Sequence, residues 1–482
     1  MKKIILTLGF IGFLFSCSDD YYESLNVDPS LPTEVPAEFL FNSATNALFD
    51  QMITPNQNLN ATRFTSQYWT QTTYIDECNY DLDGRDITGQ HWTRIYNNVL
   101  FDLENAKKNV SEKQLDNLFT ADTQKNQLAI IDIVQVFTWQ NMVDTFGNIP
   151  YSEAFQGLEN PAPAFDDART IYTDLLSRIS KSINDLSING DGFGDADAVY
   201  GGDISKWRKF ASSVKLKIAM RLADVDSGTA SAAAAEAVSS GVFTSNLDNY
   251  TIPYSTSFPN TNPLWEDLVL SGRADNVGSD IFINYLNDLN DPRRPKYFRE
   301  NLGSGIFSGG LYGGDGNAYG NSSQPGDLLH KADLPGTLMD YTEVEFLLAE
   351  AVERGFAVGG TAESHYNNAI SASLEYWGVN PVDAASYLSS PEVAYSTASG
   401  DWKQKIAKQF WIAMYNNPME GWAVVRKLDY PVLAIADDSE LPSPKRYTYP
   451  VSERTINPDH YTQASEAMGG DTQQTRIFWD VN

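Results

Sequence analysis

Apolar side chains recur every three or four residues along much of this chain, and this spacing directs it towards a helical fold. Such steps align on one face of an α-helix, which completes a turn in about 3.6 residues. Asp203 or Ser205 is a suitable N-cap for the helix expected over residues 205–225, because both side chains accept hydrogen bonds from backbone N–H groups. The buried face of that helix is formed by Trp207, Phe210, Val214, Ile218, Leu222 and Val225.

The same periodicity predicts further helices. Residues 127–143 are apolar around their whole circumference, which indicates an internal helix. One-faced patterns occupy residues 92–108, 168–186, 338–355, 364–377 and 403–415. The connections between them favour a mainly α fold of stacked helical hairpins of tetratricopeptide-like type, with long irregular loops.

The first residues have the pattern of a bacterial lipoprotein signal peptide. Two lysines precede an apolar run over residues 4–15, and Ser16 then stands directly before Cys17. The run is too short to cross ~30 Å of hydrocarbon as a helix, which indicates a cleaved segment. We expect Cys17 to be the lipid-attachment residue; an ordinary secretory signal cleaved elsewhere is the alternative. The predicted division is a signal peptide over 1–16, a lipidated tether over 17–36 and one helical domain over 37–482.

Composition argues against several functions. The chain has 63 acidic and 34 basic side chains and a net charge of −29 at pH 7. This charge repels nucleic acids and anionic headgroups, so membrane attachment must come from the lipid, although the charge also acts as a solvating coat. Once Cys17 is lipidated, Cys78 is the only thiol left, so neither an intrachain disulfide nor a multi-cysteine metal site can form.

The sequence contains no recognisable catalytic or cofactor motif. It has no H-E-x-x-H, G-x-S-x-G, P-loop or G-x-G-x-x-G pattern. Carboxylates are too numerous for any pair to indicate a glycosidase. No second ligand at metal spacing accompanies the four histidines, His91, His330, His365 and His460. We therefore expect no catalytic residue, no metal ion and no cofactor.

Three long irregular segments, residues 70–90, 250–278 and 303–326, interrupt the helices. The last contains nine glycines in 24 residues, which excludes a helix. Long loops in compact domains are commonly functional, and we expect these three to form a ligand-binding face. Aromatic rings stack on the C–H faces of sugars, while amide and charged groups bind their hydroxyls. The candidate ligand-binding residues on this basis are Trp69, Tyr74, Asn79, Tyr80, Trp265, Arg273, Asp275, Tyr312 and Tyr319.

Both tryptophans among these candidates have an alternative interpretation. Trp265 is the preferred candidate, because it lies outside any long apolar stripe and precedes Arg273 and Asp275. It would otherwise pack its loop onto the body of the protein. Trp69 would otherwise end the preceding helix and pack inward.

Several segments match a known family in their order along the chain. Residues 144–154 read Asp-Thr-Phe-Gly-Asn-Ile-Pro-Tyr-Ser-Glu-Ala, and residues 206–211 read Lys-Trp-Arg-Lys-Phe-Ala. Further matching elements are residues 216–221, 291–293, 297–298, 341, 343, 346–351, 366–370, 409–412, 426–431 and 447–450. Together they resemble the SusD/RagB family of outer-membrane nutrient-binding lipoproteins, in particular its SusD-like branch.

Lys427 departs from the family pattern, which often has a second arginine there. Glu345 lies near the apolar stripe of its helix, so we expect it in an internal ion pair.

The resemblance implies a noncatalytic surface lipoprotein of the outer membrane, facing the cell exterior. It would bind oligosaccharides and deliver them to a SusC-like TonB-dependent transporter. The RagB side of the family implies a peptide-binding subunit of a RagAB-like transporter as an alternative. A helical lipoprotein glycosidase and a structural helical-repeat scaffold are alternatives from other classes. Product formation separates the enzyme from the binders, and calorimetry separates glycan from peptide.

Overall fold

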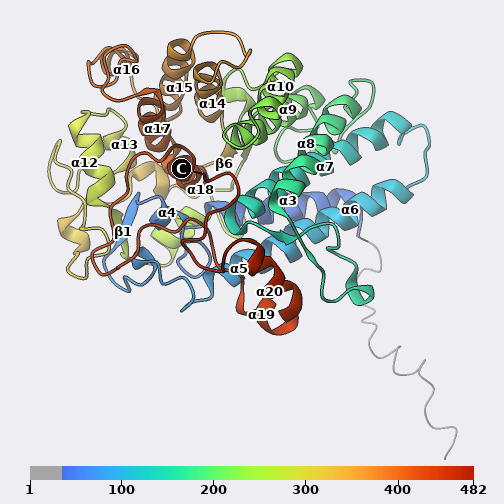
Figure 1. Ribbon diagram of the computed structural model, residues 1–482. Coiled ribbons are helices and arrows are strands. Elements are labelled where there is room, and N and C mark those ends of the chain that lie inside the picture. Colours follow the sequence, from blue (N-terminus) through green and yellow to red (C-terminus); the bar gives the residue numbers. More distant parts are fainter. Residues whose placement is uncertain (1–34, 482) are drawn as a thin grey trace, which may run out of the picture.

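Helices dominate residues 35–481, the part of the chain that the computed structural model describes (Figure 1). Cys17 and the signal peptide lie outside the described residues. The longer helices are α3 (Ala37–Ile53), α5 (Ile87–Arg94), α6 (Phe101–Glu112), α7 (Ala121–Phe146), α8 (Ala168–Asp185), α9 (Ile204–Leu222), α10 (Ser227–Ser240), α12 (Asp280–Asp288), α14 (Tyr341–Glu353), α15 (Ala362–Tyr376), α16 (Pro381–Leu388), α17 (Trp402–Ala413), α18 (Pro418–Leu428) and α20 (Pro458–Ala467). The short ones are α4 (Thr62–Thr65), α11 (Pro263–Trp265), α13 (Arg294–Tyr297) and α19 (Val451–Ile456).

Successive helices fold back on each other as hairpins. Helices that follow each other in the sequence contact one another in four pairs, α7/α8, α9/α10, α14/α15 and α17/α18 (Figure 1). Helix α3 packs against α6. The hairpins are stacked, because α8 also contacts α9 and α14 contacts α17. The predicted mainly α fold of stacked hairpins is therefore confirmed. Within the described residues, no helix has both the length and the apolar composition that crossing a membrane requires.

The two helices analysed most closely in the sequence have the expected environments. α7 is buried around its circumference, which confirms an internal helix. It ends at Gly147 (φ +85°), where a Cβ atom would lie 2.5 Å from the sulfur of Met468, so the position requires glycine. α9 is capped by Asp203, whose carboxylate accepts hydrogen bonds from the backbone N–H groups of Ser205 and Lys206.

Two helix predictions differ from the structure in detail. The helix expected over residues 92–108 is interrupted by a π-helical segment, Ile95–Leu100. The helix expected over residues 338–355 begins only at Tyr341, because Asp340 caps it by accepting a hydrogen bond from the Glu343 N–H. The residues before Asp340 belong to a strand instead.

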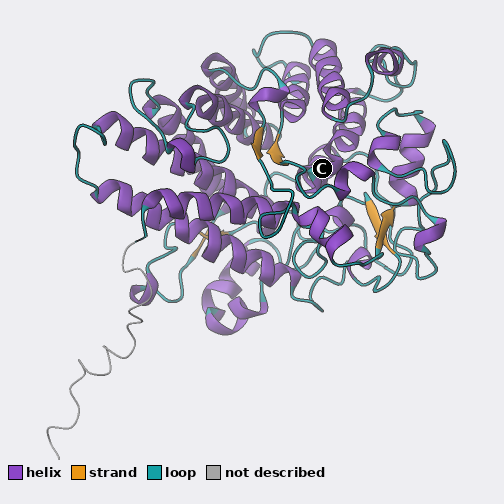
Figure 2. Cartoon of the chain, turned by 180° about the vertical axis from the view of Figure 1, so that it is seen from behind, coloured by secondary structure: helices purple, strands orange, loops and turns teal. Residues whose placement is uncertain are grey.

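Strands are short within the described residues and form three antiparallel pairs (Figure 2). The pairs are β1 (Trp69–Gln71) with β5 (Asn276–Gly278), β2 (Ile149–Pro150) with β3 (Phe165–Asp166), and β4 (Tyr250–Ile252) with β6 (Gly336–Met339).

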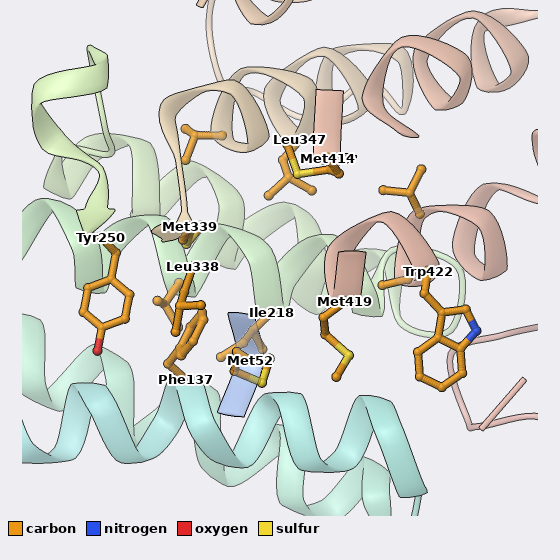
Figure 3. Packing of buried hydrophobic residues seen from close by; sticks show 14 of the residues in the cluster. Met52, Phe137, Ile218, Tyr250, Leu338, Met339, Leu347, Met414, Met419 and Trp422 are labelled. Atoms are coloured by element: carbon orange, nitrogen blue, oxygen red, sulfur yellow. The ribbon is translucent and has the colours of Figure 1, made fainter. Parts of the chain in front are cut away.

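One continuous core lies between the hairpins. Figure 3 shows Phe137 of α7, Ile218 of α9, Leu347 of α14 and Met419 of α18 converging in it. Burial of such side chains supplies roughly 1.5–3 kcal/mol each. The core thus unites helices that are distant in sequence.

A cluster of buried charges also crosses this core, and we call it the core ion network (Asp144, Lys217, Arg221, Glu343 and Glu420). Lys217 Nζ lies 2.9 Å from Glu343 Oε1 and 2.8 Å from Glu420 Oε2. Arg221 donates to Asp144 over 3.1 Å and to Glu420 over 2.7 Å. The network joins α7, α9, α14 and α18 by buried ion pairs, and those of Arg221 are charge-assisted hydrogen bonds.

Two further charged residues of the sequence analysis have defined partners. Glu345 Oε2 lies 2.7 Å from His365 Nδ1, which confirms the expected internal pair. Lys427 Nζ lies 2.6 Å from Asp224 and 3.2 Å from Glu350. Its ammonium group therefore pairs with both carboxylates at a position where the family often has the guanidinium group of an arginine.

Candidate ligand-binding site

The pairing of β1 with β5 brings two of the irregular segments together. Thr70 lies opposite Val277 in this ladder, and the N–H of Thr72 donates to the carbonyl of Asp275 over 2.8 Å. The Thr73 hydroxyl donates to the Asp275 carboxylate over 3.2 Å. Residues just after β1 and just before β5 therefore share one surface.

A polar hollow of about 60 Å³ opens at this point, and we call it the Tyr74 pocket. Three of the predicted ligand-binding residues, Tyr74, Arg273 and Asp275, line it together. The other lining residues are Asn56, Gln57, Asn58, Gln71, Thr73, Glu77, Arg85 and Asp267. Amide, carboxylate, hydroxyl and guanidinium groups thus surround one aromatic ring, which offers both donors and acceptors to a ligand.

Tyr74 presents its ring at the surface, with 63% of the side chain exposed. The guanidinium carbons of Arg85 and Arg273 lie 5.7 and 5.9 Å from the ring centroid, within cation–π range. The backbone of Tyr74 is left-handed (φ +55°), a costly conformation for a bulky residue that persists only where its surroundings enforce it. The backbone thus presents the ring at the rim of the pocket, where the two guanidinium groups lie beside it.

Acidic partners neutralise both arginines of the pocket. Arg273 pairs with Asp275, and Arg85 pairs with the fully buried Glu77. Gln71 Nε2 also donates to Glu77 over 2.7 Å, and burial raises the pKa of that carboxyl. Burial likewise raises the pKa of Asp267 to about 6, although Arg273 opposes the shift. The lining therefore has three carboxyl groups for two guanidinium groups and no unmatched cation.

Three other candidates are buried and support the loops. Trp69 is 0% exposed, and its indole N–H donates to the Tyr415 hydroxyl over 2.8 Å. Tyr80 accepts from Gln67 over 2.8 Å, and Tyr312 donates to the Phe64 carbonyl over 2.7 Å. A ligand at the surface would not reach these rings. The structure gives Trp69, Tyr80 and Tyr312 supporting positions in place of the predicted ligand contact, because irregular segments here pack their aromatics inward.

Asn79 connects three segments of the site region. Its amide donates to the carbonyl of Ile75 over 3.0 Å and to that of Gly313 over 2.8 Å. Its oxygen accepts from the N–H of Asp438 over 3.1 Å. A Cβ atom at Gly313 (φ +77°) would lie 2.6 Å from that oxygen, so this contact requires glycine.

The two remaining candidates, Trp265 and Tyr319, lie outside the lining of the Tyr74 pocket. Both are partly exposed. Trp265 ends the short helix α11, and Tyr319 begins a 3₁₀ turn in the glycine-rich segment. Ligand contact by either ring stays a prediction.

Most of the polar lining was not predicted from the sequence. Asn56, Gln57 and Asn58 follow the end of α3, and Asp267 lies in a π-helical segment after α11. Three consecutive amide side chains after a proline were the one available signal, because Asn and Pro mark turns. Nothing in the local pattern placed that turn beside Tyr74.

Comparison with known proteins identifies the family. A family model for SusD-like proteins, described as starch-binding and associating with the outer membrane, matches residues 29–450. The chain belongs to the SusD-like family. None of the curated proteins matches its sequence.

Solved structures of SusD-like proteins share the fold over nearly the whole chain. A chitin-binding protein is similar with a TM-score of 0.79 and 26% identity, covering 92% of this chain and 100% of its own. A chitin-binding SusD homologue from Flavobacterium johnsoniae has a TM-score of 0.78 and 25% identity, covering 92% of this chain and 99% of its own. A SusD homologue from Bacteroides uniformis has a TM-score of 0.76 and 26% identity, covering 92% and 100%.

Proposed function

We propose that this SusD-like protein is a noncatalytic, lipid-anchored surface protein of the outer membrane that binds neutral oligosaccharides at the Tyr74 pocket. It delivers them to a SusC-like TonB-dependent transporter. The observation that carries the binding role is the exposed ring of Tyr74 beside amide and charged groups. This combination suits sugars, which offer apolar C–H faces and hydroxyls in the same molecule.

The charge of the pocket supports a neutral ligand. Arg85 and Arg273 are paired with acids, and Asp267 adds a further carboxyl group. A carboxylated or sulfated sugar would meet this excess of carboxyl groups and the negative net charge of the chain. The names of the chitin-binding relatives and the description of the family support the same ligand class.

The transporter and the anchor rest on other support. The family is described as associating with the outer membrane, and the signal pattern before Cys17 is that of a lipoprotein. Co-purification from detergent extracts should recover a large barrel protein with this chain. Recovery of this chain alone would argue for a free-standing binder.

Calorimetry tests the binding role. Chitooligosaccharides, malto-oligosaccharides, uronate oligosaccharides and short peptides are titrated into the protein, and reducing ends are measured to detect hydrolysis. We expect binding of a neutral saccharide without hydrolysis, and a loss of tenfold or more in affinity for Tyr74→Ala, because a stacked ring contributes ~1–2 kcal/mol or more. The same loss in Trp265→Ala would extend the site to that ring.

The control is Phe39→Ala on α3, since Phe39 is 67% exposed and lies outside the pocket lining. It should bind as the wild type does. Undiminished affinity in a folded Tyr74→Ala protein would remove the pocket from the site. Binding of peptides alone would favour the RagB-like alternative, and new reducing ends would favour the glycosidase.

A further inference from the structure

A second and larger hollow lies against α6, α7 and α8. Figure 1 shows these helices on the opposite side of the molecule from β1. Helices α6, α7 and α8 and residues 151–155 form the walls of the hollow, and we call it the α6–α8 groove. Its volume is about 570 Å³, which falls in the range of small-molecule sites, roughly 300–1,000 Å³. The α6–α8 groove and the Tyr74 pocket have no lining residue in common.

Aromatic rings line part of the groove. Trp139 of α7 is 4% exposed, and its ring packs edge-on against Tyr151 with centroids 5.0 Å apart. Phe155 lies 6.2 Å from the Trp139 ring and has a left-handed backbone (φ +65°). The fold thus holds a bulky, half-buried residue in a costly conformation at the edge of a hollow, a feature that clusters at ligand sites. Trp139 lines the groove, and no hydrogen bond within the described residues uses its indole N–H.

Polar groups of the groove form one connected network. Arg178 donates to the Tyr151 hydroxyl over 2.8 Å and to Gln135 Oε1 over 2.9 Å. Tyr151 in turn donates to Asp174, and Gln135 donates to Glu104 over 3.1 Å. These contacts fix side chains of α6, α7 and α8 relative to each other, so little conformational freedom would be lost when a ligand binds.

We infer that the α6–α8 groove is a second binding site for neutral oligosaccharides. Arg178 is paired with Asp132, and Lys107 lies 4.0 Å from Glu104. The lining has three carboxyl groups, those of Glu104, Asp166 and Asp174, for these two cations, so an anionic ligand would meet an excess of negative charge. Its walls are mostly helix side chains, which give an extended peptide no row of backbone partners. Fixed rings beside fixed hydroxyl, amide and carboxylate groups match the two kinds of surface on a sugar. The site is additional to the Tyr74 pocket and does not require it.

Fluorine NMR on protein labelled with 5-fluorotryptophan tests the groove directly. The Trp139 resonance is assigned by its loss in Trp139→Phe. Chitooligosaccharides and malto-oligosaccharides are titrated into the full mature chain, with uronate oligosaccharides and short peptides as comparison probes. We expect a neutral saccharide to shift the Trp139 resonance in a saturable way, also in a Tyr74→Ala, Arg273→Ala double variant.

Two substitutions on α8 make the test specific. Thr170 is exposed and lines the groove, so Thr170→Arg should obstruct it and weaken the Trp139 response tenfold or more. Ser177→Arg adds the same charge at an exposed position of α8 outside the lining and should leave the response unchanged. A Trp139 resonance that no neutral saccharide shifts, or that only peptides or uronates shift, overturns the inference. An equal response in Thr170→Arg and Ser177→Arg overturns it as well. Failure of the Tyr74 pocket is read separately, from calorimetry on Tyr74→Ala.

Discussion

Single residues at the Tyr74 pocket have electrostatic properties set by burial. The carboxyl of Asp267 has a pKa of about 6 against an ordinary value of 3.8, because burial disfavours its charge and Asp275 adds repulsion. The folded protein therefore holds the proton more tightly than the unfolded chain does. By linkage, the stability from the neutral carboxyl is complete below about pH 4 and is lost as the pH rises through about 6.

Removing the Asp267 carboxyl should make the stability of the protein less dependent on pH. We expect Asp267→Asn to raise the free energy of unfolding at pH 8 by on the order of 1 kcal/mol, less than the full shift implies because the carboxyl is partly exposed. At pH 4 the variant and the wild type should be equally stable. Urea unfolding at the two pH values measures this, with Asp315→Asn at an exposed loop position as control. A gain of equal size at both pH values would contradict the assignment.

At the scale of elements, several of the long helices were predictable and the assembly of the site was not. Helical periodicity is a local signal, so α9 and the internal α7 could be predicted from their own residues. The β1–β5 ladder is non-local: the Thr72 hydroxyl donates to the Ala274 carbonyl across 202 positions of the chain. Strands of three residues have no recognisable pattern, and only their pairing places Tyr74, Arg273 and Asp275 together.

Aromatic content of a loop proved an incomplete guide to exposure. Tyr74 and Tyr80 lie six positions apart in one irregular segment, yet Tyr74 is 63% exposed and Tyr80 is 4% exposed. Their difference depends on contacts with other segments, such as Gln67 against Tyr80. Sequence alone could not separate a ring that faces solvent from one that anchors its loop.

We expect the hydrogen bonds of Asn79 to hold the segments of the site region together. Asn79→Ala removes its hydrogen bonds to Gly313 and to the exposed N–H of Asp438. The partly buried carbonyl of Gly313 is left without this partner, which costs ~1–3 kcal/mol. We expect a lower melting temperature and faster amide exchange in residues 303–326. Asn321→Ala, at an exposed position of the same segment, is the matched control. Unchanged exchange in Asn79→Ala would show that other contacts hold the loop.

At the scale of the whole molecule, the core ion network ties four helices into one body. Glu420 accepts from both Lys217 and Arg221, and these two cations hold its pKa below the ordinary range although burial alone would raise it. Removing one partner of a buried ion pair leaves an uncompensated charge, which typically costs about 3–5 kcal/mol.

Glu420→Gln should therefore destabilise the entire protein. We expect a loss of about 3–5 kcal/mol in the free energy of unfolding, measured by urea titration. Glu38→Gln is the control, because Glu38 and its partner Lys113 have side chains that are 33% and 46% exposed, and exposed pairs contribute about 0–1 kcal/mol. Equal and small losses in the two variants would mean that packing around α18 compensates for the missing charge.

Attachment of the whole molecule to the membrane is expected to depend on one residue outside the described part of the chain. The net charge of −29 repels anionic headgroups, so acyl chains on Cys17 must supply the affinity, and stable anchoring takes two or more of them. We expect Cys17→Ala to move the protein from the membrane fraction to the soluble fraction. Cys78→Ala is the matched control, because the other cysteine of the chain is 0% exposed and burial raises the pKa of its thiol to about 11. That variant should stay in the membrane fraction.

Unchanged fractionation of Cys17→Ala would refute the anchor. Resistance of the wild type to protease on intact cells would count against exposure at the cell exterior.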